Sequence, residues 1–180
     1  MLKKFVLGGM TALVLAACGG EGGSASSSAP AQSAGASGSL IERINNKGTI
    51  TVGTEGTYAP FTYHDKDGKL TGYDVEVTRA VAEKLGVKVE FKETQWDSMM
   101  AGLKAGRFDV VANQVGLTSP ERQATFDKSE PYSWSGAVLV ARNDSNIKSI
   151  DDIKGVKTAQ SLTSNYGEKA KAAGAELVAV

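Results

Sequence analysis

Two periods of hydrophobic and polar positions alternate along the chain from residue 49 onward. Short runs rich in β-branched residues predict buried strands, and residues 49–54 form the first of them. Residues 74–85 instead carry apolar side chains at helical spacing, in one stripe formed by Val77, Ala80, Val81 and Leu85. We therefore predict an amphipathic helix there, with Asp74 as its N-cap and Gly86 as the residue that ends it.

The same alternation continues to residue 113. The further elements expected in this part are a hairpin at 61–72, a strand at 87–93, a helix at 97–105 and a strand at 109–113. The hairpin would turn at residues 65–68, which read Asp-Lys-Asp-Gly, and Gly106 would close the second helix. A βαβαβ order of this kind predicts a mostly parallel sheet that is covered by helices.

A second series of elements begins after Tyr132. We expect a strand at 136–142, a capped helical turn at 149–155, a strand at 157–160, a helix at 164–173 and the start of a strand at 176–180. From Gly136 the series comprises only 45 residues, which is close to the size below which a core rarely stabilises itself. We therefore expect this part to be the beginning of a larger lobe and the chain to be a fragment.

The first 39 residues predict export and anchoring. Two lysines precede an apolar run at 5–17, which is too short to span a bilayer and typical of a secretory signal. The run leads into Leu-Ala-Ala-Cys at Cys18, which resembles the bacterial lipobox. Cys18 is the only cysteine, so its thiol is free for lipid, and two acyl chains would anchor it to a membrane. We predict a signal peptide at 1–17, then the acylated cysteine and a flexible Gly/Ser/Ala linker at 18–39.

Charge and composition exclude several functional classes. The formal net charge is zero, and removal of the two signal lysines leaves two net negative charges. No basic stripe with interleaved aromatic residues indicates nucleic-acid binding, and no second apolar run reaches membrane-spanning length. His64 is the only histidine and is expected to be exposed, so no usual metal site and no Ser/His/Asp or Cys/His catalytic set can be built. We predict no catalytic residue, no metal and no cofactor.

The candidate binding chemistry follows the strand at 109–113. The strand ends in a loop of small residues, and Arg122 stands two positions after Pro120. A guanidinium beside free backbone N–H groups suits a carboxylate, which an arginine can hold through two parallel hydrogen bonds. The same spacing is also compatible with a solvated turn residue, so both interpretations stay open at this point.

A resemblance to a known family bears on this choice. Ser-Pro-Glu-Arg at 119–122, followed by residues 126–132, resembles the extracytoplasmic solute-binding proteins of family 3, which serve amino-acid ABC importers. The resemblance implies an α/β fold of the periplasmic-binding-protein-like type II, with two α/β lobes, a cleft between them and an incomplete second lobe. It places lobe 1 at 40–134, without its C-terminal return segment, and the start of lobe 2 at 135–180. In this family the arginine of the turn grips the α-carboxylate of a free amino acid, which implies that role for Arg122.

The resemblance also implies roles for other residues. The ligand-binding set that it suggests is Glu55, Tyr58, Trp96, Asn113, Gly116, Thr118, Arg122, Thr163, Ser164 and Asn165. Glu55 would face the ammonium group of the ligand, and Tyr58 and Trp96 would cover opposite sides of it. The small hydroxyl residues near 163 would complete the carboxylate clamp, and Gly116, Leu117 and Thr118 remain alternative neighbours of the arginine.

Alternative interpretations accompany several of these residues. Glu55 is also compatible with a solvated position and Tyr58 with a core ring, while Trp96 is compatible with a core filler. Thr163 or Ser164 is compatible with plain N-capping of the helix that follows. Two further aromatic residues are assigned structural roles: Phe61 is placed in the core, and Trp134 is interpreted as structural.

The function implied by the resemblance is transport. The protein would capture a free polar amino acid between its lobes and deliver it to an ABC permease in the inner membrane, while a lipid anchor holds it at the periplasmic or outer face of a membrane. The stretches 113–115 and 164–166 resemble members that take cystine or cysteine. The alternatives are an enzyme on the same fold, such as a cyclohexadienyl-type dehydratase, and a surface lipoprotein with a protein partner.

Overall fold

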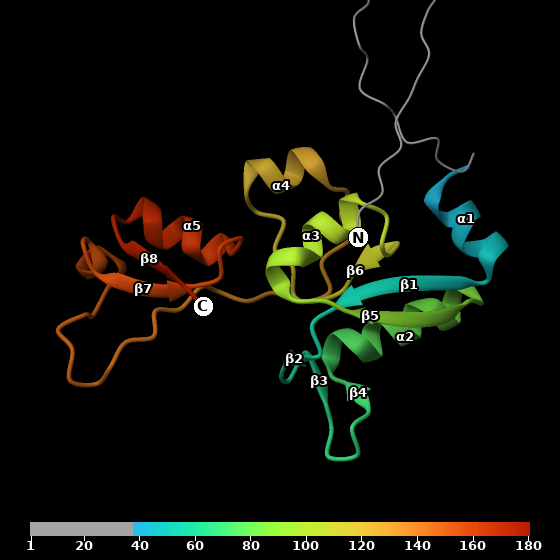
Figure 1. Ribbon diagram of the computed structural model, residues 1–180, viewed down its shortest axis with the longest axis horizontal. Helices are drawn as coiled ribbons and strands as arrows, with labels where there is room; N and C mark the ends of the chain where they lie inside the picture. Colours follow the sequence, from blue (N-terminus) through green and yellow to red (C-terminus); the bar gives the residue numbers. More distant parts are fainter. Residues whose placement is uncertain (1–37) are drawn as a thin grey trace, which may run out of the picture. The chain divides into compact units, whose positions relative to one another are not determined.

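The computed structural model describes residues 38–180 of the chain (Figure 1). The predicted signal peptide, the acylated Cys18 and nearly all of the predicted linker lie outside the described residues, so these features stay predictions. Within residues 38–180, no helix combines the length and the apolar character that a membrane crossing requires.

A three-stranded parallel sheet forms the centre of the N-terminal region, which we define as residues 38–134. Strand β1 (Thr49–Thr54) lies between β5 (Lys88–Glu93) and β6 (Val110–Val111). Helix α2 (Tyr73–Leu85) precedes β5, and α3 (Trp96–Lys104) connects β5 to β6 (Figure 1). The predicted βαβαβ order and parallel pairing are therefore confirmed, although β6 is shorter than the strand predicted at 109–113.

The hydrophobic core of this region lies around β1. Its buried members are Ile44, Ile50, Val52, Ala82 and Ala112. Half-buried apolar side chains from the flanking strands pack against them, namely Val87, Val89, Phe91 and Val110. Because the strand at the centre of the sheet contributes side chains to this core, its position is fixed from both sides by packing.

Helix α1 (Leu40–Lys47) was not expected from the periodicity. It is amphipathic but short, and its single buried side chain is Ile44. Its start is fixed by a capping box, because the Ser39 hydroxyl accepts from the Glu42 backbone N–H while the Glu42 carboxylate accepts from the Ser39 N–H. That Ser-x-x-Glu pattern is readable in the sequence and would have identified the helix.

The predicted hairpin is confirmed. Strands β3 (Thr62–His64) and β4 (Leu70–Thr71) pair antiparallel, and a further short strand, β2 (Thr57–Tyr58), pairs with β3. The turn is held by the Asp65 carboxylate, which accepts from the backbone N–H groups of Asp67 and Lys69 at 2.9 Å each. This self-bonded Asx turn is the physical basis of the Asp-Lys-Asp-Gly signal.

The predicted start of α2 is wrong, while its end is confirmed. The helix begins at Tyr73, and Asp74 lies inside it, fully buried. No side-chain cap is needed, because the N–H groups of Tyr73 and Asp74 donate to the backbone carbonyls of Pro60 and Phe61 at 3.0 and 2.9 Å. Gly86 ends the helix in the left-handed conformation, with φ of 69°, as predicted.

Phe61 lies outside the buried core, contrary to prediction, and Trp134, which was interpreted as structural, is exposed. Phe61 is half-buried and packs against the Tyr58 ring, with 5.1 Å between the ring centroids. Trp134 is 82% exposed. Phe61 stays outside because the hairpin that carries it extends from the sheet, and Trp134 precedes an exposed extended segment.

A two-stranded parallel sheet characterises the C-terminal region, which we define as residues 149–180. Strands β7 (Lys157–Gln160) and β8 (Glu176–Ala179) pair through four residues each, and helix α5 (Asn165–Ala172) connects them. The 3₁₀ helix η1 (Ile150–Ile153) precedes them and carries the expected capping box at Ser149. A small cluster of Ile153, Ala170 and Ala175 forms its core. All four predicted elements are confirmed, with ends shifted by one or two residues.

The strand predicted at 136–142 is not formed. These residues are not part of any ladder among the described residues, and the side chains of Val138 and Val140 are 84% and 89% exposed. A β-branched run favours an extended backbone, but it becomes a strand only when a neighbouring strand accepts its N–H groups. In the described part of the chain, β7 and β8 pair only with each other.

Candidate functional site

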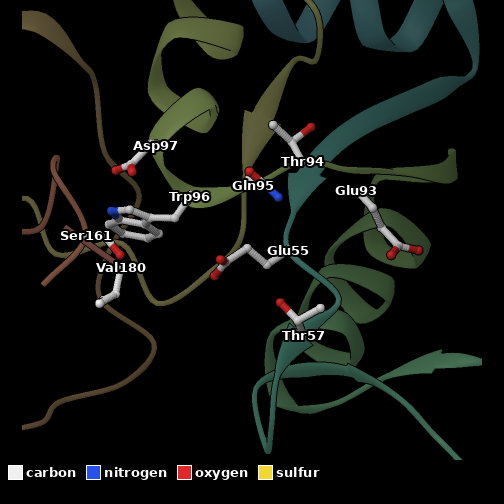
Figure 2. A pocket seen from close by; sticks show the side chains of 9 residues that line it. All are labelled: Glu55, Thr57, Glu93, Thr94, Gln95, Trp96, Asp97, Ser161 and Val180. Carbon is white, nitrogen blue, oxygen red and sulfur yellow. The ribbon is translucent and has the colours of Figure 1, made fainter. Parts of the chain in front are cut away.

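A cavity of about 460 Å³ opens at the carboxyl ends of β1 and β5 (Figure 2). Its wall is formed by Glu55, Thr57, Glu93, Thr94, Gln95, Trp96, Asp97, Ser161 and Val180. Most of these residues follow the ends of the two strands or begin α3, which is where ligands bind in open α/β sheets. Their carboxylates, hydroxyls and amide around one indole give the cavity a polar wall with one aromatic face.

Arg122 is buried beside Trp96 of the cavity wall and does not itself line the cavity. It lies on the short helix α4 (Pro120–Thr125), is 7% exposed and has its Cζ atom 5.6 Å from the centre of the Trp96 ring. Its Nη1 donates to the Gly116 carbonyl at 2.9 Å, and its Nη2 donates to the Thr163 carbonyl. The interpretation of Arg122 as a solvated turn residue is therefore wrong.

The start of helix α4 determines where the Arg122 side chain lies. The Ser119 hydroxyl caps α4 by accepting from the Arg122 backbone N–H at 3.4 Å, and Pro120 occupies the first helical position. Both features favour a helix that begins at this point. The Ser-Pro-Glu-Arg turn is thus a capped helix start that directs the arginine back across the loop before it.

Asn113 forms hydrogen bonds with both the backbone and the side chain of Glu55. The buried Asn113 side chain accepts from the Glu55 N–H at 2.8 Å and donates from Nδ2 to the Glu55 carboxylate at 2.9 Å. Glu55 is half-buried and points toward Trp96 across the cavity (Figure 2). Because the amide of Asn113 is engaged by Glu55 and Thr54, it positions the carboxylate and is not part of the cavity wall.

Trp96 and Tyr58, the two aromatic residues predicted to cover the ligand, differ in their position relative to the cavity. Trp96 lines the cavity, and its Nε1 atom is buried and has no hydrogen-bond partner among the described residues. Tyr58 is 44% exposed and is not part of the cavity wall. Tyr58 is therefore not a core ring either, and its proposed place opposite the indole is not formed in this structure.

Two of the residues near the start of α5 that were predicted to bind the ligand carboxylate already form hydrogen bonds within the chain. Ser164 caps the helix by accepting from the Tyr166 N–H at 3.2 Å, so the N-capping interpretation is confirmed for this residue. Thr163 donates from its backbone N and its Oγ1 to Asp97 at 3.0 and 2.8 Å. Asn165 reaches the loop before Arg122, where a Cβ atom added to Gly116 would lie 3.4 Å from its Nδ2.

Several residues of the cavity wall were not predicted from the sequence. Thr118, which was predicted to bind the ligand, is not part of the wall. Thr118 is exposed and is absent from the cavity wall. The residues that the sequence interpretation missed are Thr57, Glu93, Thr94, Gln95, Asp97, Ser161 and Val180. A usable signal existed for those at 93–97, because they end a predicted strand or directly follow it.

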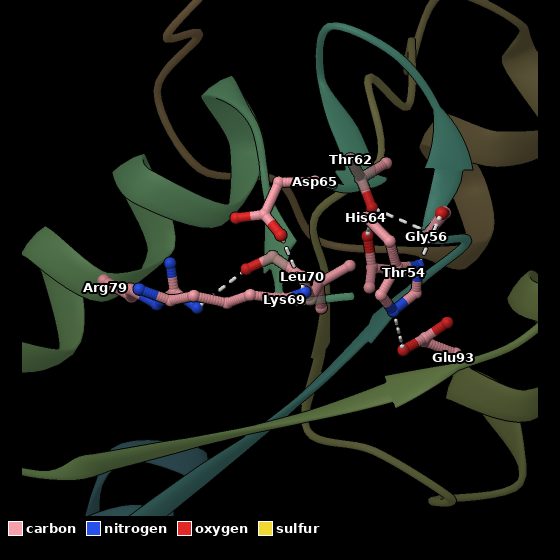
Figure 3. Close-up of polar contacts among 9 residues, drawn as sticks. All are labelled: Thr54, Gly56, Thr62, His64, Asp65, Lys69, Leu70, Arg79 and Glu93. Atoms are coloured by element: carbon pink, nitrogen blue, oxygen red, sulfur yellow. Dashed lines mark hydrogen bonds and ion pairs between the residues drawn. The ribbon is translucent and has the colours of Figure 1, made fainter. Parts of the chain in front are cut away.

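His64 contacts two residues at the edge of the cavity (Figure 3). The Nε2 atom of His64 lies 3.1 Å from the Glu93 carboxylate, and its Nδ1 lies 3.2 Å from the Gly56 carbonyl. Both partners are acceptors, so only the doubly protonated ring can donate to both. Gly56 has a φ of 74°, and a Cβ atom there would lie 2.5 Å from the Glu93 carboxylate, so the two strand ends approach closely. His64 is exposed, as expected.

A buried polar network fixes the loop that precedes Arg122. The Asp74 carboxylate accepts from the backbone N–H and the Nε2 of Gln114 at 2.8 and 2.6 Å, and the Gln114 Oε1 accepts from the Ser133 hydroxyl at 2.9 Å. Burial raises the pKa of Asp74, and the hydrogen bonds from Gln114 and Tyr132 oppose that rise. Gln114 has a φ of 51°, a conformation that these bonds stabilise.

The fold and this site define a class of protein: an α/β ligand-binding protein whose cavity lies beyond the strand ends of a parallel sheet. A comparison with protein families agrees with that definition. The model of the bacterial extracellular solute-binding proteins, family 3, matches residues 50–177, and the chain belongs to this family. The resemblance in the sequence and the type II periplasmic-binding-protein-like fold are thereby confirmed.

Individual relatives narrow the class further. The chain is similar to the probable amino-acid ABC transporter-binding protein of Haemophilus influenzae, with 60% identity over 79% of the chain and 56% of that protein. It is similar to the L-cystine-binding protein TcyA of Bacillus subtilis, with 61% identity over 79% of the chain and 53% of that protein. The crystal structure of the L-cystine solute receptor of Neisseria gonorrhoeae, unliganded and open, shares 96% identity with a TM-score of 0.53, over 79% of the chain and 60% of that structure. The chain thus spans little more than half the length of these relatives.

Proposed function

We propose that the complete protein is the substrate-binding component of an amino-acid ABC importer. It captures a free polar amino acid and passes it to a permease in the inner membrane. Membership of a solute-binding family and the printed names of its relatives support the transport role. The names of the Bacillus subtilis and Neisseria gonorrhoeae proteins make cystine the first candidate ligand, with cysteine as the second.

The single observation that carries this proposal is the buried guanidinium of Arg122 beside a polar cavity. A guanidinium has five N–H donors, and two of them are engaged by backbone carbonyls here. The remaining donors can hold the α-carboxylate of a ligand as a pair of parallel bonds. Across the cavity, the Glu55 carboxylate that Asn113 orients accepts the ligand's ammonium group.

We infer that the protein binds its ligand by closure. The carboxylate partners come from two distant parts of the chain, Arg122 from the N-terminal region and Thr163 from the C-terminal region. The two regions already meet in this structure, because Arg122 donates to the Thr163 carbonyl. In the complete protein, a ligand held between the lobes accepts from donors of both, so it shifts the equilibrium toward the closed state. Micromolar affinity corresponds to about 8 kcal/mol, and each buried charge left unpaired costs roughly 2–5 kcal/mol.

The envelope location is part of the same proposal. An apolar signal at 1–17 and the lipobox-like cysteine support export and acylation at Cys18. The lipid anchor and the linker at 18–39 hold the receptor near its permease while leaving it free to move. Incorporation of labelled palmitate into the full-length protein, and its loss in Cys18→Ser, is the direct test of the anchor.

The ligand role of Arg122 is tested by calorimetry on the full-length protein. Wild type is titrated with cystine and with each of the twenty amino acids, and Arg122→Ala and Arg122→Lys are titrated with whichever ligand binds. We expect Arg122→Ala to abolish measurable binding, because the ligand carboxylate then lacks its charged partner. Arg122→Lys keeps the charge but not the planar fork, so we expect intermediate affinity. Near-normal affinity in Arg122→Ala would remove this residue from the site.

The enzyme alternative requires a free acid or base in the cavity. Glu55 was the only candidate in the sequence, and its carboxylate accepts a hydrogen bond from Asn113. The structure adds Glu93 and Asp97 to the cavity wall, and these carboxylates contact His64 and Thr163, respectively. The chain belongs to a family of solute-binding proteins, so we propose a binding protein and not a dehydratase. Turnover of a cyclohexadienyl acid by the purified full-length protein would overturn this choice.

A further inference from the structure

Asp97 forms a contact that the proposed binding cycle does not explain. It lies in the first turn of α3, on the wall of the cavity and next to Trp96 (Figure 2). Its Oδ1 atom accepts from the backbone N–H of Thr163 at 3.0 Å and from the Thr163 hydroxyl at 2.8 Å. The two residues are 66 positions apart in the sequence, so the contact joins the N-terminal and C-terminal regions.

The chemistry of this contact matches that of a bound ligand. The Asp97 side chain ends in a carboxylate, the same group that the ligand would present to the Thr163 donors. The Thr163 carbonyl is engaged as well, because it accepts from Arg122. Every polar group of Thr163 is therefore satisfied by this chain itself.

The donors of Thr163 cannot serve two carboxylates fully at once. A backbone N–H and a hydroxyl each provide one proton for donation. When a ligand carboxylate accepts these two bonds, Asp97 must give them up. The contact between Asp97 and Thr163 consequently belongs to the unliganded state.

We propose that Asp97 is an affinity-setting residue, an internal carboxylate that occupies the Thr163 donors until the ligand displaces it. This inference rests on the proposed role of Thr163 in the carboxylate clamp. A contact made only without ligand stabilises the unliganded state and therefore opposes binding. Removal of the Asp97 carboxylate raises the affinity for the amino acid, which is the opposite of the effect expected at Arg122 or Glu55.

The expected size of the effect is modest. Both partners are exposed, so solvent competes for these hydrogen bonds and reduces their net contribution. We expect Asp97→Ala to bind cystine about threefold to tenfold more tightly than wild type. Asp97→Asn keeps an acceptor oxygen but loses the charge, so its affinity should fall between the two. Ser98→Ala, an exposed neighbour on the same helix, is the matched control and should bind as wild type does.

The affinities are measured by calorimetry with the full-length protein, and a second readout needs no ligand. Hydrogen exchange of the Thr163 amide is followed by NMR in unliganded wild type, Asp97→Ala and Ser98→Ala. We expect Thr163 to be protected in wild type and Ser98→Ala and to exchange faster in Asp97→Ala. Unchanged exchange, or a loss of affinity in Asp97→Ala, would overturn the inference. If no amino acid binds wild type, the proposed function fails, while the exchange experiment still decides whether Asp97 holds Thr163.

Discussion

The N-terminal and C-terminal regions have hydrophobic cores of different size. Ile50 in the central strand of the first sheet is 6% exposed, while in the C-terminal region Ile153 is 1% exposed and Ile150 on the same 3₁₀ helix is 48% exposed. In the N-terminal region, five buried residues and four half-buried ones pack around β1. In the C-terminal region, all four residues of β8 are exposed, and three buried residues form the cluster, with three half-buried ones packed against it.

The contrast shows which part of the site is preorganised. Glu55, Trp96 and Arg122 belong to the densely packed region, where buried neighbours and the Asn113 network determine their orientation. Thr163 belongs to the loosely packed region and contacts the cavity through Asp97 and Arg122. Under the proposed function, we expect the densely packed region to set recognition and the loosely packed region to adjust to the ligand.

The largest expected effect tests this contrast directly. Ile50→Ala should lower the free energy of unfolding of the full-length protein by about 2–5 kcal/mol, because it removes buried methyl groups from a packed core. The matched substitution Ile150→Ala should change it by at most about 0.5 kcal/mol, since that side chain is half exposed. Urea denaturation followed by circular dichroism measures both. Equal losses in the two variants would show that the exposed fraction of these side chains does not determine their contribution to stability.

A smaller effect concerns the buried Asp74. Burial raises the pKa of this carboxyl above its ordinary value of 3.8, so the folded protein holds a proton that the unfolded chain releases in the window just above that value. The stability of wild type relative to Asp74→Asn should therefore increase as the pH falls from 7 into this window. This added stability of wild type should be lost as the pH rises through the pKa that Asp74 has in the folded protein. The difference in unfolding free energy between the two proteins is measured at several pH values, and a difference independent of pH would contradict the expectation.

The smallest effect is expected at the rim of the cavity. His64→Gln removes the contact between the ring Nε2 and the Glu93 carboxylate, whose two side chains are 39% and 45% exposed. Exposed pairs contribute roughly 0.2–1 kcal/mol, so the free energy of unfolding should fall by no more than that. Thermal unfolding in low and high salt provides the measurement, because screening should abolish the difference. A loss that persists in high salt would show that the ring acts through packing.

The sequence predicted the regular parts of the fold because their signals are local. The β-branched run at β1 and the glycine at Gly86 each specify their own structure through neighbouring residues. The segment at 136–142 carries a similar local signal, yet it forms no strand among the described residues because a strand also requires a partner. Asp74 was misassigned for a related reason, since backbone carbonyls of the distant hairpin satisfy the helix start.

The candidate site was predictable only where one residue carries the chemistry. Arg122 could be selected from its turn, and its burial agrees with that choice. Asn113 was selected for contact with ligand, but its amide is engaged by Glu55, a contact across 58 positions that no local pattern reveals. The pairing of Asp97 with Thr163 depends on two regions meeting, so it could be found only in three dimensions.

The backbone conformation at Gly56 has a consequence for which positions of the cavity wall can be substituted. A side chain at this position would collide with Glu93, and the backbone there adopts a conformation that other residues rarely accept. Glu55 and Thr57 on either side meet no such obstacle and both face the cavity. A substitution at Thr57 therefore changes the cavity wall without the backbone strain that one at Gly56 would cause.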